Sequence, residues 1–563
     1  MRFVIEGYPY PRAAIKQVVP EFIDLSLQSD NAEIKLGYVG YCYSPDINDS
    51  IFFLPKVILE ESNDSLVFGK YSPLELLNAE DAYRNKRISA DDFKFLHDLS
   101  TWLYRAIKEF KDHHKDSKIV TQRSASFLDS SHHKVDATIM DVILSLIKYY
   151  EENQNYFMFV IRNIHSGYNK LNWRKTIGLQ QPYMQNGKPI YLKPINKKKQ
   201  INFDEELLII FYSILNYINK EQGFPCKVNC NYDLIDGSLF KAYRKGLGKI
   251  RLKEIKYKYF SDKALRLWEL CYAYFDCSSQ ILSSKKIEDL LIASDFNVVF
   301  EGIIDELIGE NAPEDLHYKE QYDGKRVDHI YPYTSLIRPD NIYYIGDSKY
   351  YKIGGSLGTT SVYKQYTYAK NVIQYNFNPF DGKIIQKLPY RDELTEGYNI
   401  TPNFFISAEL HKKPYLFDKP MLVMRETDKD KRVSKQFDNR LFDRDTLWLS
   451  HYDINFLYVL ALYGRGNYDA KHAFKKKVRR MFRNQIIELI KQQYFFYKVL
   501  FETKEELVEF VNKNFKTLIG KLYHYDENLY IILALEQKNK EDLDRIKNLI
   551  LSQNYNLVDY EFE

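Results

Sequence analysis

Tyr343-Tyr344-Ile345-Gly346-Asp347-Ser348-Lys349 is an aromatic and β-branched run that ends in an acidic and a basic residue. This composition predicts a buried β-strand. Because successive side chains of a strand point to opposite faces, we expect Asp347 and Lys349 to emerge side by side and Ser348 to face away. The stretch therefore predicts a carboxylate and an ammonium group together at one edge of an apolar sheet.

A second carboxylate, Asp328, begins another β-prone run upstream of this strand. If the two runs form a hairpin with Asp328 opposite Asp347, the connecting loop falls at about residues 333–342, which are rich in turn-favouring residues. Asp340 is a competing candidate, but it precedes Asp347 by seven residues. At about 3.3 Å per strand residue this separation is roughly 20 Å, so we assign Asp340 to the loop.

Two helices are predicted on either side of the hairpin in the sequence. Upstream, apolar residues repeat at helical spacing after a Ser294-Asp295 cap, and Glu301 lies at the edge of the apolar stripe, where it could point at the two aspartates. Downstream, residues 362–375 form the second predicted helix, with Gln365 and Tyr368 on one face.

The order of these elements resembles the PD-(D/E)xK nuclease superfamily. The resemblance is carried by a helix with Glu301, a strand with Asp328, the strand ending Asp347-Ser348-Lys349, and a helix with Gln365 and Tyr368. It implies a restriction-endonuclease-like core, a mixed sheet flanked by helices. It further implies that the acidic residues bind Mg²⁺, or alternatively Mn²⁺, that Lys349 orients or activates the attacking water, and that Gln365 supports the site. The sequence departs from the pattern at Val327, where the superfamily often has proline.

Phosphodiester hydrolysis explains why these residue types belong together. The reaction needs charge neutralised on the phosphoryl oxygens and a water made nucleophilic, and a carboxylate-held Mg²⁺ supplies both. The expected ligands are Asp328 and Asp347, with Glu301 outermost. Lys349 would contact the scissile phosphate or the water. An isolated Asp-x-Lys on a strand is more often an exposed ion pair, so it is the four-part order that favours a nuclease.

Composition places limits on the remaining hypotheses. A length of 563 residues predicts about four domains. The net charge of +4 is nearly balanced, so any DNA-binding surface must be a local patch. Five cysteines without a C-x₂-C pair favour reduced thiols in the cytoplasm over zinc. We expect no signal peptide and no membrane span, since the longest apolar stretch, around residues 454–463, is too short.

The predicted fold class is multidomain α+β or α/β. The expected parts are a β-rich N-terminal module with helices that could dock a partner (1–130), a helical region (131–264), the nuclease domain (265–465), and a basic helix followed by a small α/β domain (466–563).

Positively charged segments provide three candidate DNA contacts. In the helical region, helices followed by a small basic hairpin around Asn186-Gly187 resemble a winged helix. Its contacts to the DNA backbone would come from Trp173, Arg174, Lys175, Lys188 and Lys193. A helical domain with a solvated hairpin is the alternative. The basic segment 244–258 could line a DNA channel, and the cluster Lys475 to Arg483 could bind backbone or form a solvated face.

Short segments outside the core resemble the LlaJI-type restriction endonucleases, relatives of McrC. They are Ile51-Phe52-Phe53-Leu54-Pro55-Lys56, Leu171-Asn172-Trp173-Arg174-Lys175-Thr176 and His451-Tyr452-Asp453-Ile454-Asn455-Phe456-Leu457. This resemblance implies a bacterial antiviral nuclease that cuts double-stranded DNA with an AAA+ NTPase of the McrB kind. The sequence has no Gly-x₄-Gly-Lys-Ser/Thr motif, so a nucleotide-driven motor would be a separate chain. A stand-alone restriction enzyme and a non-catalytic scaffold that stimulates an NTPase remain the alternatives.

Overall fold

A computed structural model describes the chain apart from short segments and single positions. The exceptions are residues 22, 24–32, 62–65, 129–133, 155, 157, 165–169, 203–204, 223, 225, 227–230, 284–287, 311–325, 354, 356–357, 378–387, 389, 411–415, 426–432, 526–527 and 563. In the remaining, described part, every helix is too short or too polar to cross a membrane.

The N-terminal module is built on a five-stranded sheet. Its order is β1 (Arg2–Ile5), β5 (Asp49–Leu54), β4 (Val39–Ser44), β13 (Asp289–Ala293) and β6 (Val120–Arg123). Helix α4 (Ala90–His113) packs on it, and its N-terminus is capped by the side chain of Ser89. Smaller elements are β2 (Pro9–Pro11), α1 (Arg12–Lys16), β3 (Glu33–Lys35), α2 (Pro73–Leu76) and α3 (Ala79–Arg84). Strands β4 and β5 form an antiparallel hairpin.

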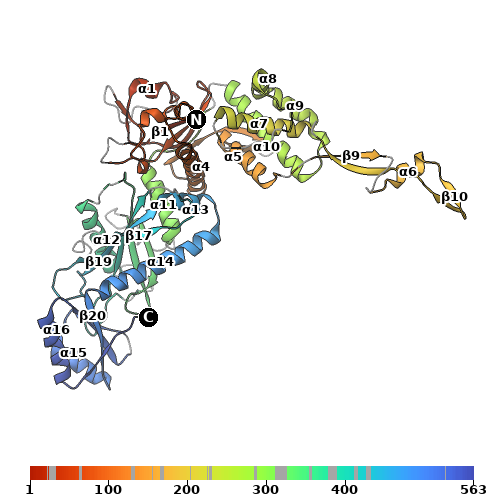
Figure 1. The fold of residues 1–563 in the computed structure, drawn as a ribbon. Helices are drawn as coiled ribbons and strands as arrows, with labels where there is room; N and C mark the ends of the chain where they lie inside the picture. Colours follow the sequence, from red (N-terminus) through yellow and green to blue (C-terminus); the bar gives the residue numbers. More distant parts are fainter. Residues whose placement is uncertain are drawn as a thin grey trace.

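The middle region consists mainly of helices that lie beside the N-terminal sheet (Figure 1). They are α5 (Ile139–Glu152), α7 (Glu206–Gln222), α8 (Gly237–Ala242), α9 (Gly248–Ile255) and α10 (Asp262–Ser283), with a short hairpin β7 (Ala125–Leu128) and β8 (Lys134–Ala137). Helix α10 packs on α5 and α7, and β13 then returns to the N-terminal sheet. The predicted boundary at residue 265 therefore falls inside α10 and does not coincide with the start of a new sheet.

An extended arm projects from the middle helices (Figure 1). Its base is an antiparallel ribbon of β9 (Phe159–Ile164) and β12 (Asn196–Ile201), and its tip holds α6 (Trp173–Leu179) and the hairpin β10 (Tyr183–Gln185) and β11 (Lys188–Ile190). The ribbon separates this hairpin from the helices of the middle region, so the hairpin does not pack against them as it would in a winged helix.

The central sheet carries the candidate site. Its order is β14 (His329–Thr334), β15 (Asn341–Lys349), β16 (Pro402–Glu409), β19 (Leu447–Asn455) and β17 (Leu422–Met424), and β18 (Val433–Ser434) also pairs with β19. Strands β15, β16 and β19 are parallel, and the flanking strands are antiparallel. The helices are α11 (Phe296–Ile308), α12 (Thr359–Phe377), α13 (Phe456–Gly464) and α14 (Tyr468–Lys491). The domain is thus a mixed sheet with helices on both faces.

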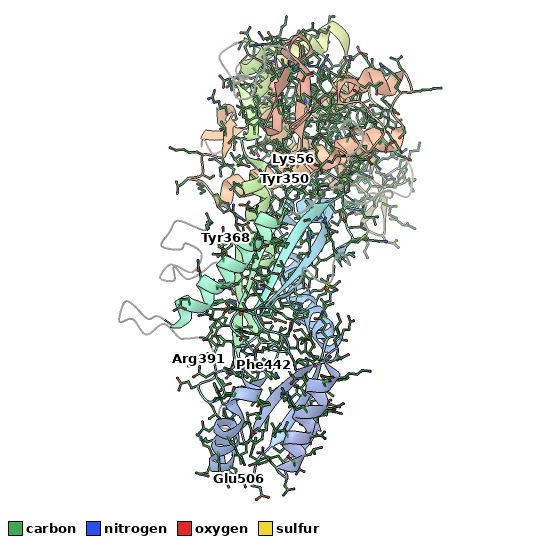
Figure 2. The ribbon with its side chains drawn as sticks, turned by 90° about the vertical axis from the view of Figure 1, so that its left-hand side faces the viewer. Lys56, Tyr350, Tyr368, Arg391, Phe442 and Glu506 are labelled. Carbon is green, nitrogen blue, oxygen red and sulfur yellow. The ribbon has the colours of Figure 1, made fainter. Side chains whose placement is uncertain are left out.

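A small domain at the C-terminus follows α14 (Figure 2). It is an antiparallel sheet in the order β21 (Leu522–His524), β22 (Tyr530–Glu536), β20 (Tyr494–Leu500) and β23 (Asn556–Asp559), with α15 (Lys504–Leu518) and α16 (Lys540–Ser552). Thr503 caps the N-terminus of α15, and its side chain accepts from the Glu506 amide. Two apolar clusters form the core of this domain and its junction with the central sheet.

Candidate active site

The two predicted aspartates lie opposite each other at one end of the β14–β15 hairpin. His329 pairs with Gly346, so the next step in the same register brings Asp328 beside Asp347. The two carboxyl groups are within hydrogen-bonding reach. The connecting loop is residues 335–340 and includes Asp340, which pairs with Arg338 and not with the site. The register proposed from the sequence is therefore the register of the structure.

Lys349 ends the same strand on the same face as Asp347. Its Nζ lies 2.5 Å from Asp347 Oδ2, and Ser348 between them points to the other face. Burial alone would lower the pKa of Lys349, but the charge and hydrogen bond of Asp347 outweigh burial and raise the pKa. The Lys349 amine is therefore a protonated hydrogen-bond donor at neutral pH, not a free base.

Glu301 approaches the aspartates from α11. Asp295 caps this helix by accepting from the Asn297 amide, as the sequence predicted. Burial, together with the nearby charge of Asp347, raises the pKa of Glu301 to about 7. Glu301 thus belongs to the same acidic group as Asp328 and Asp347.

The other end of α11 is fixed by basic residues of α14. Arg479 donates from Nε to the carbonyl of Ile308 and from Nη2 to that of Gly309, and Lys475 donates to Gly309 as well. Cations at a helix C-terminus satisfy its last carbonyls and its dipole. These two members of the predicted DNA-binding cluster are therefore structural, whereas Lys476, Lys477 and Arg480 are exposed.

Gln365 supports the site strand from α12. Its Nε2 donates to the Ile345 carbonyl at 3.1 Å and to Asn403 Oδ1 at 3.3 Å, and the residue is fully buried. These bonds fix β15 two residues before Asp347. Gln365 thus contacts the backbone of β15 and not the carboxylates. Tyr368, on the same helix, is half-buried.

The donor set fits a hard divalent cation. Asp347 Oδ1 is buried and has no hydrogen-bond partner among the residues that the structure describes. Burial, the hydrogen bond to Asp347 and the charges of Asp347 and Glu301 raise the pKa of Asp328, which shows that negative charge there is under-compensated. Among the described residues, no three acidic, imidazole or thiol groups are arranged as a ready-made metal site. Mg²⁺ needs only one or two carboxylates, completed by waters and substrate phosphate, so Asp328 and Asp347 suffice.

A second polar row continues across the same face of the sheet and was not predicted. In register, Asp347 aligns with Phe405 and His451, and Lys349 aligns with Ser407 and Asp453. Ser407 Oγ lies 2.7 Å from His451 Nε2. Arg425 binds both carboxylate oxygens of Asp453 at 2.7 Å. Ser407, His451 and Asp453 come together only because β16 and β19 pair in parallel, and no local sequence pattern predicts this pairing.

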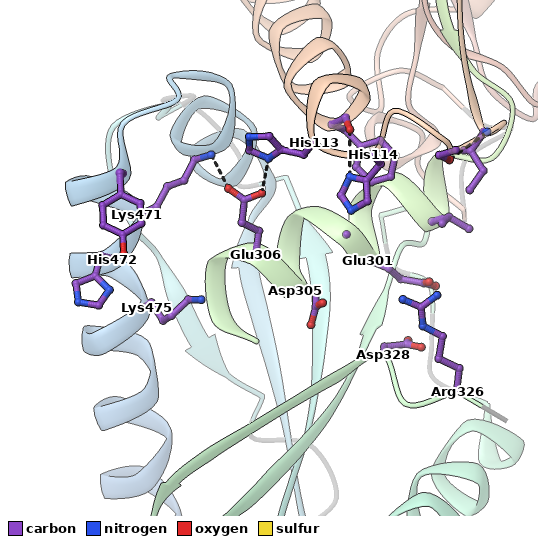
Figure 3. A pocket seen from close by; sticks show the side chains of 16 residues that line it. His113, His114, Glu301, Asp305, Glu306, Arg326, Asp328, Lys471, His472 and Lys475 are labelled. Carbon is purple, nitrogen blue, oxygen red and sulfur yellow. Dashed lines mark hydrogen bonds and ion pairs between the residues drawn. The ribbon is translucent and has the colours of Figure 1, made fainter. Parts of the chain in front are cut away.

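A cavity of about 870 Å³ opens beside the acidic group. Glu301, Asp328 and Arg326 lie at one end, and basic side chains of α14 lie at the other (Figure 3). Between them Glu306 accepts from Lys471 at 2.7 Å and pairs with His113 of α4 at 2.8 Å. The cavity therefore joins the N-terminal module, the acidic group and α14.

The comparison with solved structures gave a distant likeness. No family model matches the chain, and no curated protein matches it. Among solved structures it is similar to a chain of the refined half-complex from the tetradecameric assembly of Thermococcus gammatolerans McrB AAA+ hexamers with bound McrC. The TM-score is 0.29 and the identity 12%, over 85% of this chain and 99% of that chain. Because this TM-score is too low to support an argument about function, the site is interpreted from its own geometry.

Proposed function

We propose that the chain is a Mg²⁺-dependent DNA endonuclease with a PD-(D/E)xK core. The observation that carries the proposal is the hairpin register, which brings Asp328 and Asp347 together with Lys349 beside them. Glu301 on a preceding helix and Gln365 on a following helix complete the order of elements. The mixed sheet with helices on both faces supports the same proposal.

The mechanism assigns each side chain a part in phosphodiester hydrolysis. When bound, Mg²⁺ supplies charge neutralisation and an activated water. Asp328 and Asp347 would hold it, and Asp328, whose pKa is raised, would release its proton on binding. Glu301 would add a third carboxylate to this acidic group. Protonated Lys349 would donate to an oxygen of the scissile phosphate or orient the attacking water. Gln365 would keep β15 in place.

We further propose that the nuclease acts in antiviral restriction with an AAA+ NTPase of the McrB kind. The support is the resemblance of its short segments to LlaJI-type enzymes and the lack of a P-loop motif in its own sequence. The tip of the arm exposes large apolar side chains, which suit a protein partner better than DNA backbone. They include Trp173, Ile177, Leu179, Tyr183, Met184 and Leu192.

A cleavage assay on plasmid DNA tests the proposal and separates its alternatives. We would incubate the chain with Mg²⁺, alone and together with a candidate AAA+ partner and its nucleotide. Cleavage only with the partner supports the restriction subunit, and cleavage by the chain alone indicates a stand-alone enzyme. Stimulated NTPase activity without any cleavage would contradict the nuclease and indicate a scaffold. Asp347→Ala should abolish cleavage, whereas Lys364→Ala, at an exposed position of α12, should not.

A further inference from the structure

The residue after Lys349 belongs to a buried contact with the N-terminal module. Tyr350 is 4% exposed, and its hydroxyl donates to Glu6 Oε2 at 2.5 Å and accepts from the Lys56 amide at 3.0 Å. Glu6 follows β1 and Lys56 follows β5, two neighbouring parallel strands. Figure 2 shows Lys56 and Tyr350 together where the two parts of the chain meet. The catalytic strand thus ends directly in a contact with another module.

Lys56 also reaches the helix that carries Glu301. Its Nζ lies 4.8 Å from the centre of the Tyr350 ring, 3.9 Å from Glu6 Oε1 and 3.4 Å from Asn297 Oδ1. Asn297 is in the first turn of α11, one helical turn before Glu301. Lys56 therefore contacts both α11, which carries Glu301, and the residue that follows Lys349 at the end of β15.

Main-chain bonds provide a second attachment a few residues later. The Ile353 amide donates to the Leu59 carbonyl at 2.9 Å, and the Glu61 amide donates to the Ile353 carbonyl at 3.0 Å. The segment after Lys349 is consequently bound to the N-terminal module at two points. A shift of that module would move the end of β15 with it.

We propose that Glu6, Lys56 and Tyr350 are positioning residues through which the N-terminal module places Lys349 and Glu301 for cleavage. This inference rests on the proposed nuclease function. The polar contact is separable from packing, because the Tyr350 ring also packs on Phe296 and Phe456, with centroids 5.4 and 6.3 Å away. Tyr350→Phe keeps this aromatic packing but removes the buried hydroxyl that donates to Glu6. Removing one partner of a buried hydrogen bond costs free energy.

Single-turnover cleavage at saturating DNA, with any required partner and Mg²⁺ present, tests the inference. Because small displacements of catalytic groups cost up to about 100-fold in rate, Tyr350→Phe should lower the rate by about 10- to 100-fold and leave DNA affinity unchanged. Glu6→Gln, which keeps an acceptor for the hydroxyl, should lose less than Glu6→Ala. The control is Tyr149→Phe, which removes a hydroxyl bond to the Lys263 carbonyl in the middle region.

The outcomes distinguish this inference from the proposed function. A wild-type rate for Tyr350→Phe, or an equal loss in Tyr350→Phe and Tyr149→Phe, overturns the positioning role. If the wild-type chain does not cut, the nuclease proposal fails together with the role in cleavage, and amide hydrogen exchange across residues 347–353 then decides whether the contact holds the end of β15 in place. Faster exchange there in Tyr350→Phe but not in Tyr149→Phe supports it, and unchanged exchange overturns it.

Discussion

Replacing Gly346 with alanine tests whether the strand that carries Asp347 is as closely packed as the structure shows. An added Cβ would stand 2.0 Å from Phe404 Cε2 and 2.2 Å from its Cζ. The ring cannot move away freely, since it is fully buried and packs on Phe482 and Tyr331 at centroid distances of 4.9 and 6.0 Å. Overpacking of this kind costs about 1–3 kcal/mol, so we expect that loss in the free energy of unfolding.

Urea unfolding measures this loss, and two further variants make the result specific. Gly178→Ala, in α6 with nothing within 4 Å of the added Cβ, should keep or raise stability by up to about 1 kcal/mol. Phe404→Leu combined with Gly346→Ala should recover part of the loss, with a coupling of about 0.5–3 kcal/mol. If Gly346→Ala is as stable as the wild type, or if the losses of the two substitutions simply add, the close packing of Gly346 against Phe404 is contradicted.

Three other predictions concern charges. Burial raises the pKa of the Asp289 carboxyl to about 8, compared with about 3.9 in the unfolded chain. The stability that this carboxyl contributes is therefore complete below about pH 4 and is lost as the pH rises through 8. Between about pH 5 and 8, urea titrations should show a smaller loss of stability in Asp289→Asn than in the wild type. Arg479→Gln should cost about 1–3 kcal/mol in thermal unfolding, whereas exposed Lys476→Gln should stay within about 0.5 kcal/mol. Lys349→Gln should lower the cleavage rate about 10²- to 10³-fold, while Mn²⁺ binding, measured by calorimetry, persists. A cleavage rate equal to that of the wild type would contradict the proposed role of Lys349.

The sequence predicted those parts of the central domain that local patterns encode. The β-branched run and the turn residues around Pro339 fixed the hairpin, and its register followed from placing Asp328 opposite Asp347. Helical periodicity and the Asp295 cap located α11. These features depend on residues close together in the chain, so no tertiary information was needed to find them.

Features that depend on distant pairing were missed. Lys197 to Lys199 lack apolar alternation, yet they form a strand because β9 supplies the partner. His451 and Ser407 meet only through the parallel pairing of β16 and β19. Arg479 was grouped with the exposed bases of α14, because sequence cannot show that the end of α11 lies beside it.

In the proposed mechanism Asp328 and Asp347 together hold a divalent cation. Anomalous scattering from crystals grown with Mn²⁺ would locate this ion. We expect a peak about 2 Å from a carboxylate oxygen of each residue, and loss of the peak in Asp347→Ala. A peak elsewhere, or no peak in wild-type crystals at saturating Mn²⁺, would contradict it.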